Sequence, residues 1–169
     1  WNYPYLVAVN SIIPAMASGN TVILKHSAQT PLCAEQLYES AKKTLPKDVF
    51  NYLHLNHEDS LKVVSEKRIN FVSFTGSVKA GYDVQKATHT KFIDMALELG
   101  GKDPAYARHD CDLEKTVENL VDGSFFNSGQ SCCGIERIYV DEKIYSNFIE
   151  LFASKTYNYN LGNPLNKET

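Results

Sequence analysis

Short β-rich apolar runs alternate with helical segments through residues 1–99, and this alternation restricts the fold more than any other feature. Strands are predicted at 21–25, 49–55, 70–74 and 92–97. Helices are predicted at 5–18 and 58–67, from Thr30 as the N-cap to about 43, and from a cap at 75–77 to about 87. Repeated strand–helix alternation is typical of βαβ units. We therefore expect an α/β fold with a mostly parallel, Rossmann-like sheet and helices on both faces.

The rhythm changes after Gly100-Gly101, where we expect a domain boundary. A strand at 104–107 is followed by a helix at 113–126, a glycine-containing turn with two cysteines, a strand at 137–140 and a helix at 142–157. The aromatic residues Phe125, Phe126, Phe148 and Phe152 are expected in a core. The sequence thus predicts two parts, 1–99 and 100–169.

Composition excludes several classes of protein. A net charge of −3 and a pI near 6.0 provide no basic surface for nucleic acid or an anionic membrane. No apolar run reaches the roughly 20 residues of a membrane span, and the N-terminus lacks the features of a secretory signal. The chain does not begin with Met, and we expect it to be the central part of a longer protein.

The cysteine pattern predicts free thiols. Adjacent cysteines rarely bridge each other, and the spacings match neither a disulfide framework nor a zinc site. The four are Cys33, Cys111, Cys132 and Cys133. The histidines show no metal-ligand spacing either. We expect no metal, and a reducing location in the cytoplasm or an organelle matrix, with one thiol as a candidate nucleophile.

Two motifs could carry catalysis. Cys132 ends the segment Asn127-Ser-Gly-Gln-Ser-Cys, whose glycine turn can leave backbone N–H groups available to a thiolate or an oxyanion. Glu98 lies between two leucines at the end of a predicted strand, where desolvation would raise its pKa and suit a general base. Taken alone, a small buried Cys and a solvated Glu are the more common interpretations.

Two further motifs could bind a phosphorylated ligand. Gly76-Ser77 opens a predicted helix, and a helix N-terminus can hold phosphate. Lys25 follows a predicted strand, at the edge where parallel sheets bind ligands. An N-cap without a ligand and a surface Lys remain the plain alternatives.

The motifs occur together in one order. They are Trp-Asn-Tyr-Pro, Leu-Lys-x-Ser-x-Gln-Thr-Pro, Phe-Thr-Gly-Ser, Leu-Glu-Leu-Gly-Gly-Lys-Asp-Pro and Asn-Ser-Gly-Gln-x-Cys. This series resembles the NAD(P)-dependent aldehyde dehydrogenase superfamily along the whole chain. The resemblance implies an incomplete cofactor domain at 1–99 joined to the start of a thiol-bearing catalytic domain at 100–169.

The resemblance also implies roles for individual residues. Cys132 matches the family's nucleophile, Glu98 its general base, and Asn2 the amide that helps the Cys132 backbone N–H to bind the oxyanion. A small aldehyde would be oxidised to its acid through a thiohemiacetal and a thioester. The full-length protein is expected to be a homo-oligomer, a dimer or tetramer.

Cofactor contacts follow by the same resemblance. The matching positions are Trp1, Lys25, Ser27, Ala28, Gly76, Ser77 and Leu99. Members that prefer NAD often carry Glu where this chain has Ala28, and that carboxylate repels a 2′-phosphate. NAD or NADP is therefore expected, with Lys25 and Ser27 as candidate phosphate ligands.

The sequence departs from the family pattern in two places. A Gly-x-Gly stretch of many members is replaced by residues 54–57, and the later Glu-x-Phe-Gly-Pro segment is absent. One alternative is a truncated, inactive homologue with a binding or structural role, and we expect this segment alone to be inactive. A CoA-acylating relative is the other alternative, but such relatives typically lack the general base that Glu98 matches.

Overall fold

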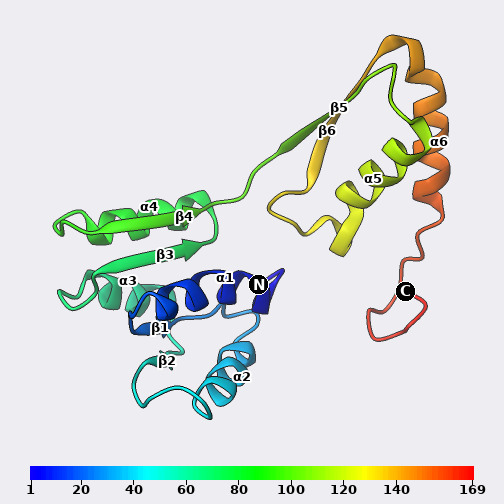
Figure 1. The fold of residues 1–169 in the computed structure, drawn as a ribbon. Helices are drawn as coiled ribbons and strands as arrows, with labels where there is room; N and C mark the ends of the chain where they lie inside the picture. The colour runs from blue at the N-terminus through cyan, green and yellow to red at the C-terminus, as the bar shows by residue number, and fades with distance from the viewer. The chain divides into compact units, whose positions relative to one another are not determined.

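Three pairs of parallel strands organise the chain in a computed structural model that describes residues 1–169 (Figure 1). The pairs are β1 (Val22–Leu24) with β2 (Phe50–Tyr52), β3 (Phe71–Thr75) with β4 (Asp94–Glu98), and β5 (Asp103–Ala107) with β6 (Ile135–Val140). The expected α/β class and parallel pairing are confirmed. Within residues 1–99, where one parallel sheet was expected, β1–β2 and β3–β4 form two separate ladders.

The chain forms two compact units, Trp1–Leu99 and Gly100–Thr169. The first contains four helices: α1 (Pro4–Ala17), α2 (Leu32–Ala41), α3 (His57–Ser65) and α4 (Val78–Thr88). Helix α1 begins with Pro, which has no N–H to leave unpaired there. It ends before Gly19, whose φ of +84° suits a residue without Cβ.

The start of α2 differs from the prediction. Thr30 was expected to cap it, but the helix begins after Pro31 and has no side-chain cap. The Thr30 hydroxyl instead lies 3.2 Å from Nδ1 of His26. A hydroxyl that bonds a side chain four residues earlier in the same loop is not available to cap the helix.

The first unit has its core between α1, β2 and their neighbours. Ala8, Ile12 and Phe50 are buried there, and Leu24 of β1 packs against them. Ala8 and Ile12 are four residues apart and so lie on the same face of α1, and this face packs on the strands. This packing fixes the start of α1 relative to the carboxyl end of β1.

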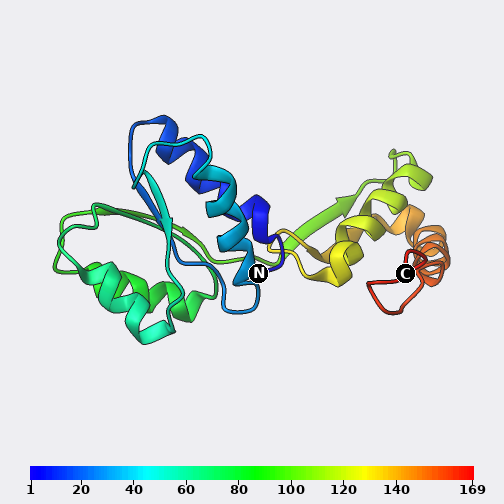
Figure 2. The same cartoon turned by 90° about the horizontal axis from the view of Figure 1, so that it is seen from below.

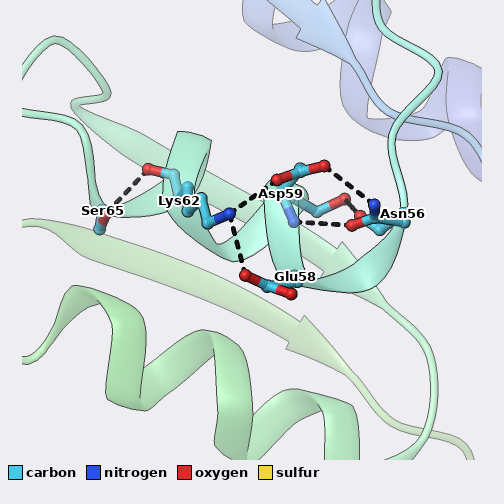
Figure 3. Close-up of polar contacts among 6 residues, drawn as sticks. Asn56, Glu58, Asp59, Lys62 and Ser65 are labelled. Carbon is cyan, nitrogen blue, oxygen red and sulfur yellow. Dashed lines mark hydrogen bonds and ion pairs between the residues drawn. The ribbon is translucent and has the colours of Figure 1, made fainter.

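Helix α3 depends on polar contacts, because it has no buried residue (Figure 3). Asn56 Oδ1 accepts the Asp59 N–H at 2.8 Å, and Asn56 Nδ2 donates to the Asp59 carboxylate at 2.9 Å. Lys62 Nζ lies 2.9 Å from both Glu58 and Asp59. The cap satisfies helix-end N–H groups that would otherwise lack partners.

The second unit packs α5 (Leu113–Phe125) and α6 (Tyr145–Tyr157) side by side against β5 and β6 (Figures 1 and 2). Ala107, Val117 and Phe148 form the buried centre, with Leu120 and Val121. Phe125 and Phe126 were expected in the core but are 41% and 55% exposed. They lie at the end of α5, where the chain leaves the helix for the thiol turn.

The predicted helix at 142–157 is divided. A short 3₁₀ helix, η2 (Glu142–Ile144), precedes α6, because the Asp141 carboxylate accepts the Lys143 N–H at 3.0 Å and caps the shorter turn. Another, η1 (Phe126–Gly129), follows α5. None of the helices combines the length and apolar character required for a membrane span.

Replacing Asn56 with Ala removes both of its bonds to Asp59. We expect the free energy of unfolding to fall by about 1 kcal/mol, the usual effect of losing an N-cap. Urea denaturation followed by circular dichroism measures this change. Asn10→Ala, the same substitution at an exposed position in α1, should change it by less than about 0.5 kcal/mol. Equal effects would contradict the capping role.

Candidate active site

The candidate base, Glu98, lies at the carboxyl end of β4. Beside it, after the end of β3, lies the candidate phosphate-binding turn, Gly76-Ser77. Thr75 and Glu98 are register partners at the ends of the two strands. The Gly76 N–H continues the ladder by donating to the Glu98 carbonyl at 2.9 Å. Parallel sheets bind ligands at this edge. Two residues far apart in sequence are therefore fixed at one location.

Gly76 and Ser77 form an exposed turn into α4. Ser77 is the N-cap, and its Oγ accepts the Ala80 N–H at 3.2 Å. A Cβ on Gly76 would lie 2.5 Å from Cζ of Phe74, so the ring leaves no room for a side chain. A helix N-terminus with a bare backbone beside it suits the approach of a pyrophosphate.

Leu99 lies against the same helix. A Cβ at Gly81 of α4 would be 2.7 Å from Leu99 Cδ2, so Gly81 allows the close contact. The half-buried Leu99 thus connects the end of β4 to α4. Its contact with a cofactor remains a prediction.

Glu98 itself is exposed. Of the two interpretations that the sequence left open, a desolvated base and a solvated carboxylate, this exposure agrees with the second. In a strand, successive side chains point to opposite faces, so Leu97 and Leu99 face away from the carboxylate of Glu98. Both leucines are half-buried while Glu98 faces solvent.

A second group of candidates follows β1. Lys25 and Ala28 are exposed, while Ser27 is half-buried and its Oγ accepts the Gln29 N–H at 3.2 Å. Sequence analysis did not single out His26 between them. Its ring is 9% exposed, and Nε2 lies 2.9 Å from the Pro4 carbonyl oxygen. The sequence contains no signal for this contact, because His26 and Pro4 are 22 positions apart.

Trp1 and Asn2 immediately precede α1. Trp1 is 49% exposed and Asn2 is half-buried. The His26–Pro4 hydrogen bond connects their segment to the loop that carries Lys25 and Ser27. The first unit therefore connects the segment of Trp1 and Asn2 to the loop of Lys25 and Ser27.

Cys132 belongs to the second unit, in the turn that follows η1. The three residues Asn127, Ser128 and Gly129 have φ angles of +53°, +58° and +71°. Reciprocal amide bonds hold this left-handed stretch: Asn127 Nδ2 donates to the Gln130 carbonyl at 3.2 Å, and Gln130 Nε2 to the Asn127 carbonyl at 3.0 Å. Such conformations are costly for residues with a side chain and persist only where the surroundings enforce them.

Both cysteines of the turn are exposed and free. The Cys133 thiol lies 3.2 Å from Ser131 Oγ. The Cys132 carbonyl lies only 3.4 Å from where a Cβ on Gly101 would be, so Gly101 admits the thiol turn beside it. Lys102, the residue after Gly101, forms an ion pair with Glu136 of β6. This contact connects the Gly101 segment to β6.

Side-chain contacts join helix α3 to helix α4, the helix that begins after Ser77. His57 Nε2 lies 3.1 Å from the Asp83 carboxylate, and Lys79 Nζ lies 3.4 Å from the same oxygen. The hydrogen bond with His57, with Lys79 nearby, lowers the pKa of Asp83 below its ordinary value.

Comparison with known proteins identifies the family. The model of the aldehyde dehydrogenase family matches residues 1–169. Lactaldehyde dehydrogenase of Methanocaldococcus jannaschii is 39% identical over 175 residues, which is 100% of this chain and 37% of that protein. D-glyceraldehyde dehydrogenase (NADP(+)) of Picrophilus torridus is 34% identical over 166 residues, 97% of this chain and 34% of that protein.

Solved structures agree with the sequences. A crystal structure of an NAD-dependent aldehyde dehydrogenase from Sinorhizobium meliloti has a TM-score of 0.96 at 32% identity, covering 100% of this chain and 34% of that one. The chain belongs to the aldehyde dehydrogenase family, as its motifs predicted. It spans about a third of the length of the curated relatives it matches.

His57→Ala should raise the pKa of Asp83 toward its ordinary value, with the carboxyl followed by NMR during a pH titration. Because the folded-state pKa is lowered, the pair stabilises the protein above the unfolded-state pKa of about 3.9. That contribution is lost as the pH falls through the lowered pKa. Lys79→Ala should give a smaller rise, because the bond from His57 is the larger cause. A larger rise in the Lys79 variant would contradict this ranking.

Proposed function

We propose that this chain supplies the nucleophile, the general base and part of the cofactor site of an enzyme that oxidises an aldehyde to its carboxylic acid with NAD or NADP. The observation that carries the proposal is the family match over residues 1–169, together with an exposed thiol at Cys132 in a constrained turn. Its units 1–99 and 100–169 are assigned to the cofactor domain and the start of the catalytic domain.

The proposed reaction begins with the Cys132 thiolate. It adds to the aldehyde carbon, and the oxyanion accepts hydrogen bonds from the Asn2 side-chain amide and the Cys132 backbone N–H. NAD(P), when bound, supplies the acceptor for the hydride. Addition comes first because a planar aldehyde carbon is a poor hydride donor, and loss of hydride leaves a thioester on Cys132.

Glu98 completes the proposed cycle by accepting a proton from water as the water attacks the thioester carbonyl. The carbon–sulfur bond then breaks, the acid leaves, and Cys132 returns as the thiolate. The exposed position of Glu98 suits this role, since its carboxylate must reach water. The backbone bond to Gly76 fixes the chain at Glu98 while leaving the side chain able to move.

The residues at the two strand ends fit a dinucleotide. Gly76 presents bare backbone at the start of α4 to a pyrophosphate, and Ser77 lies beside it. Lys25 and Ser27 would meet the adenosine ribose, with Trp1 and Leu99 as further contacts. The loop bears Ala28 where a carboxylate would oppose a 2′-phosphate, and the relative from Picrophilus torridus is named for NADP(+).

We propose a reducing location, in the cytoplasm or an organelle matrix, because the nucleophile must remain a thiol. A homo-oligomer is proposed for the complete enzyme.

Replacing Cys132 with Ala should lower kcat at least about a thousandfold, because no other group forms the covalent intermediate. The assay measures NADH or NADPH formation with a panel of aldehydes, using the polypeptide that the gene encodes. Cys133→Ala is the matched control and should retain most of the activity. Equal activity in the two variants would reject Cys132 as the nucleophile, and an inactive wild type would favour the inactive homologue.

Replacing Ala28 with Glu should raise KM for NADP by about tenfold, a change that corresponds to about 1.4 kcal/mol. The new carboxylate would repel the 2′-phosphate but could bind the ribose hydroxyls of NAD. Steady-state kinetics with both cofactors measures the ratio. Gln29→Glu adds the same charge at the next exposed position and should change the ratio less. A similar change in both would indicate a general charge effect.

A further inference from the structure

His26 is a buried residue in the middle of an otherwise accessible loop. It lies between the exposed Lys25 and the half-buried Ser27, yet its own side chain is 9% exposed. Both ring nitrogens have partners: Nε2 is 2.9 Å from the Pro4 carbonyl oxygen, and Nδ1 is 3.2 Å from Thr30 Oγ1. The ring is therefore held from two sides.

The chemistry of the partners defines the ring's hydrogen bonds. A carbonyl oxygen can only accept, so Nε2 must carry the proton and donate to Pro4. In the neutral ring Nδ1 then accepts from the Thr30 hydroxyl, and in the charged ring it donates to the same oxygen. Both bonds can therefore form in either state, which suits a permanent tether.

The tether joins two helix starts that have no side-chain cap of their own. Tyr3, the N-cap of α1, makes no side-chain cap bond, and neither does Pro31 at the start of α2. His26 reaches the first residue of α1 on one side and the residue before Pro31 on the other. It thus supplies polar contacts at both ends of the loop.

We propose that His26 is a positioning residue that holds the Asn2 segment and the Lys25–Ser27 loop in one fixed arrangement. The inference rests on the proposed function, in which Asn2 binds the oxyanion and Lys25 and Ser27 bind the cofactor. Because one ring fastens both segments, its loss disturbs transition-state binding and cofactor binding together. Catalytic groups must be held to within a fraction of an ångström to be effective.

This proposal has a distinctive kinetic signature. Asn2→Ala should mainly lower kcat, and Lys25→Ala should mainly raise KM for the cofactor. His26→Ala should do both, each by about five- to tenfold, the size expected when each segment loses one hydrogen bond. A variant that merely folds less well lowers the active fraction and so the apparent kcat, but leaves KM unchanged.

Two milder variants separate positioning from folding. His26→Gln keeps an N–H donor that can reach the Pro4 carbonyl, and it should recover most of kcat. Thr30→Val removes the hydroxyl with little change in shape, and it should raise KM for the cofactor less than His26→Ala does. His89→Ala, an exposed His at the end of α4, is the matched control and should change neither constant.

The experiment measures kcat and cofactor KM for all variants in the polypeptide that the gene encodes. A His26→Ala variant with wild-type constants, or with lower kcat and unchanged KM, overturns the inference. So does His26→Gln that behaves like Ala. The wild type separates the two proposals: no turnover rejects the proposed function and this inference together, whereas turnover that His26→Ala leaves unchanged rejects this inference alone.

Discussion

The backbone pairing of β3 with β4 is the constraint on which the candidate site of the first unit depends. Thr75 and Glu98 are partners in register, and the Gly76 N–H extends the ladder to the Glu98 carbonyl. A slip of one residue would turn Glu98 to the opposite face, because side chains alternate along a strand. The same slip would move Gly76 away from the end of β4. One ladder therefore sets the positions of the candidate base and the candidate phosphate-binding turn together.

The two glycines after Glu98 have separate structural reasons. Gly100 has a φ of +83°, a conformation that residues with a Cβ seldom adopt. A Cβ on Gly101 would lie 2.8 Å from the Asp103 carboxylate and 3.4 Å from the Cys132 carbonyl oxygen, so a side chain there would require a neighbour to shift. The two glycines and the left-handed stretch before Cys132 therefore reflect demands of backbone geometry more than of side-chain chemistry.

The sequence predicted the order and kind of the elements, because apolar periodicity is a local property of the chain. It overestimated the first two strands: the run at 49–55 contains only the three residues of β2, since strand length is set by the partner's ladder. It underestimated β6, which is two residues longer than the predicted 137–140. The cap at Thr30 and the core position of Phe126 were wrong for a related reason. Each depends on what the rest of the molecule places beside the residue.

The candidate site shows the same difference between what local motifs predict and what depends on contacts elsewhere in the molecule. Its residues could be proposed because the family motifs occur in this chain in one order, and the resemblance needed no geometry. His26 could not be found, since it occupies a variable position of the motif and acts through a carbonyl 22 positions away. A tether of this kind becomes visible only when burial and hydrogen bonding are known together.

The loop after β1 also has a charge balance that bears on cofactor choice. Residues 25–31 contain no carboxylate, and Lys25 is their only permanent charge. The polar groups of His26 and Thr30 bond each other inside the loop. The next acidic residue, Glu35, lies 2.9 Å from His54 Nε2 at the end of β2. On the proposed assignment of this loop to the adenosine ribose, a 2′-phosphate would meet the cation of Lys25 and no carboxylate from residues 25–31. NAD and NADP are therefore both compatible with this part of the chain.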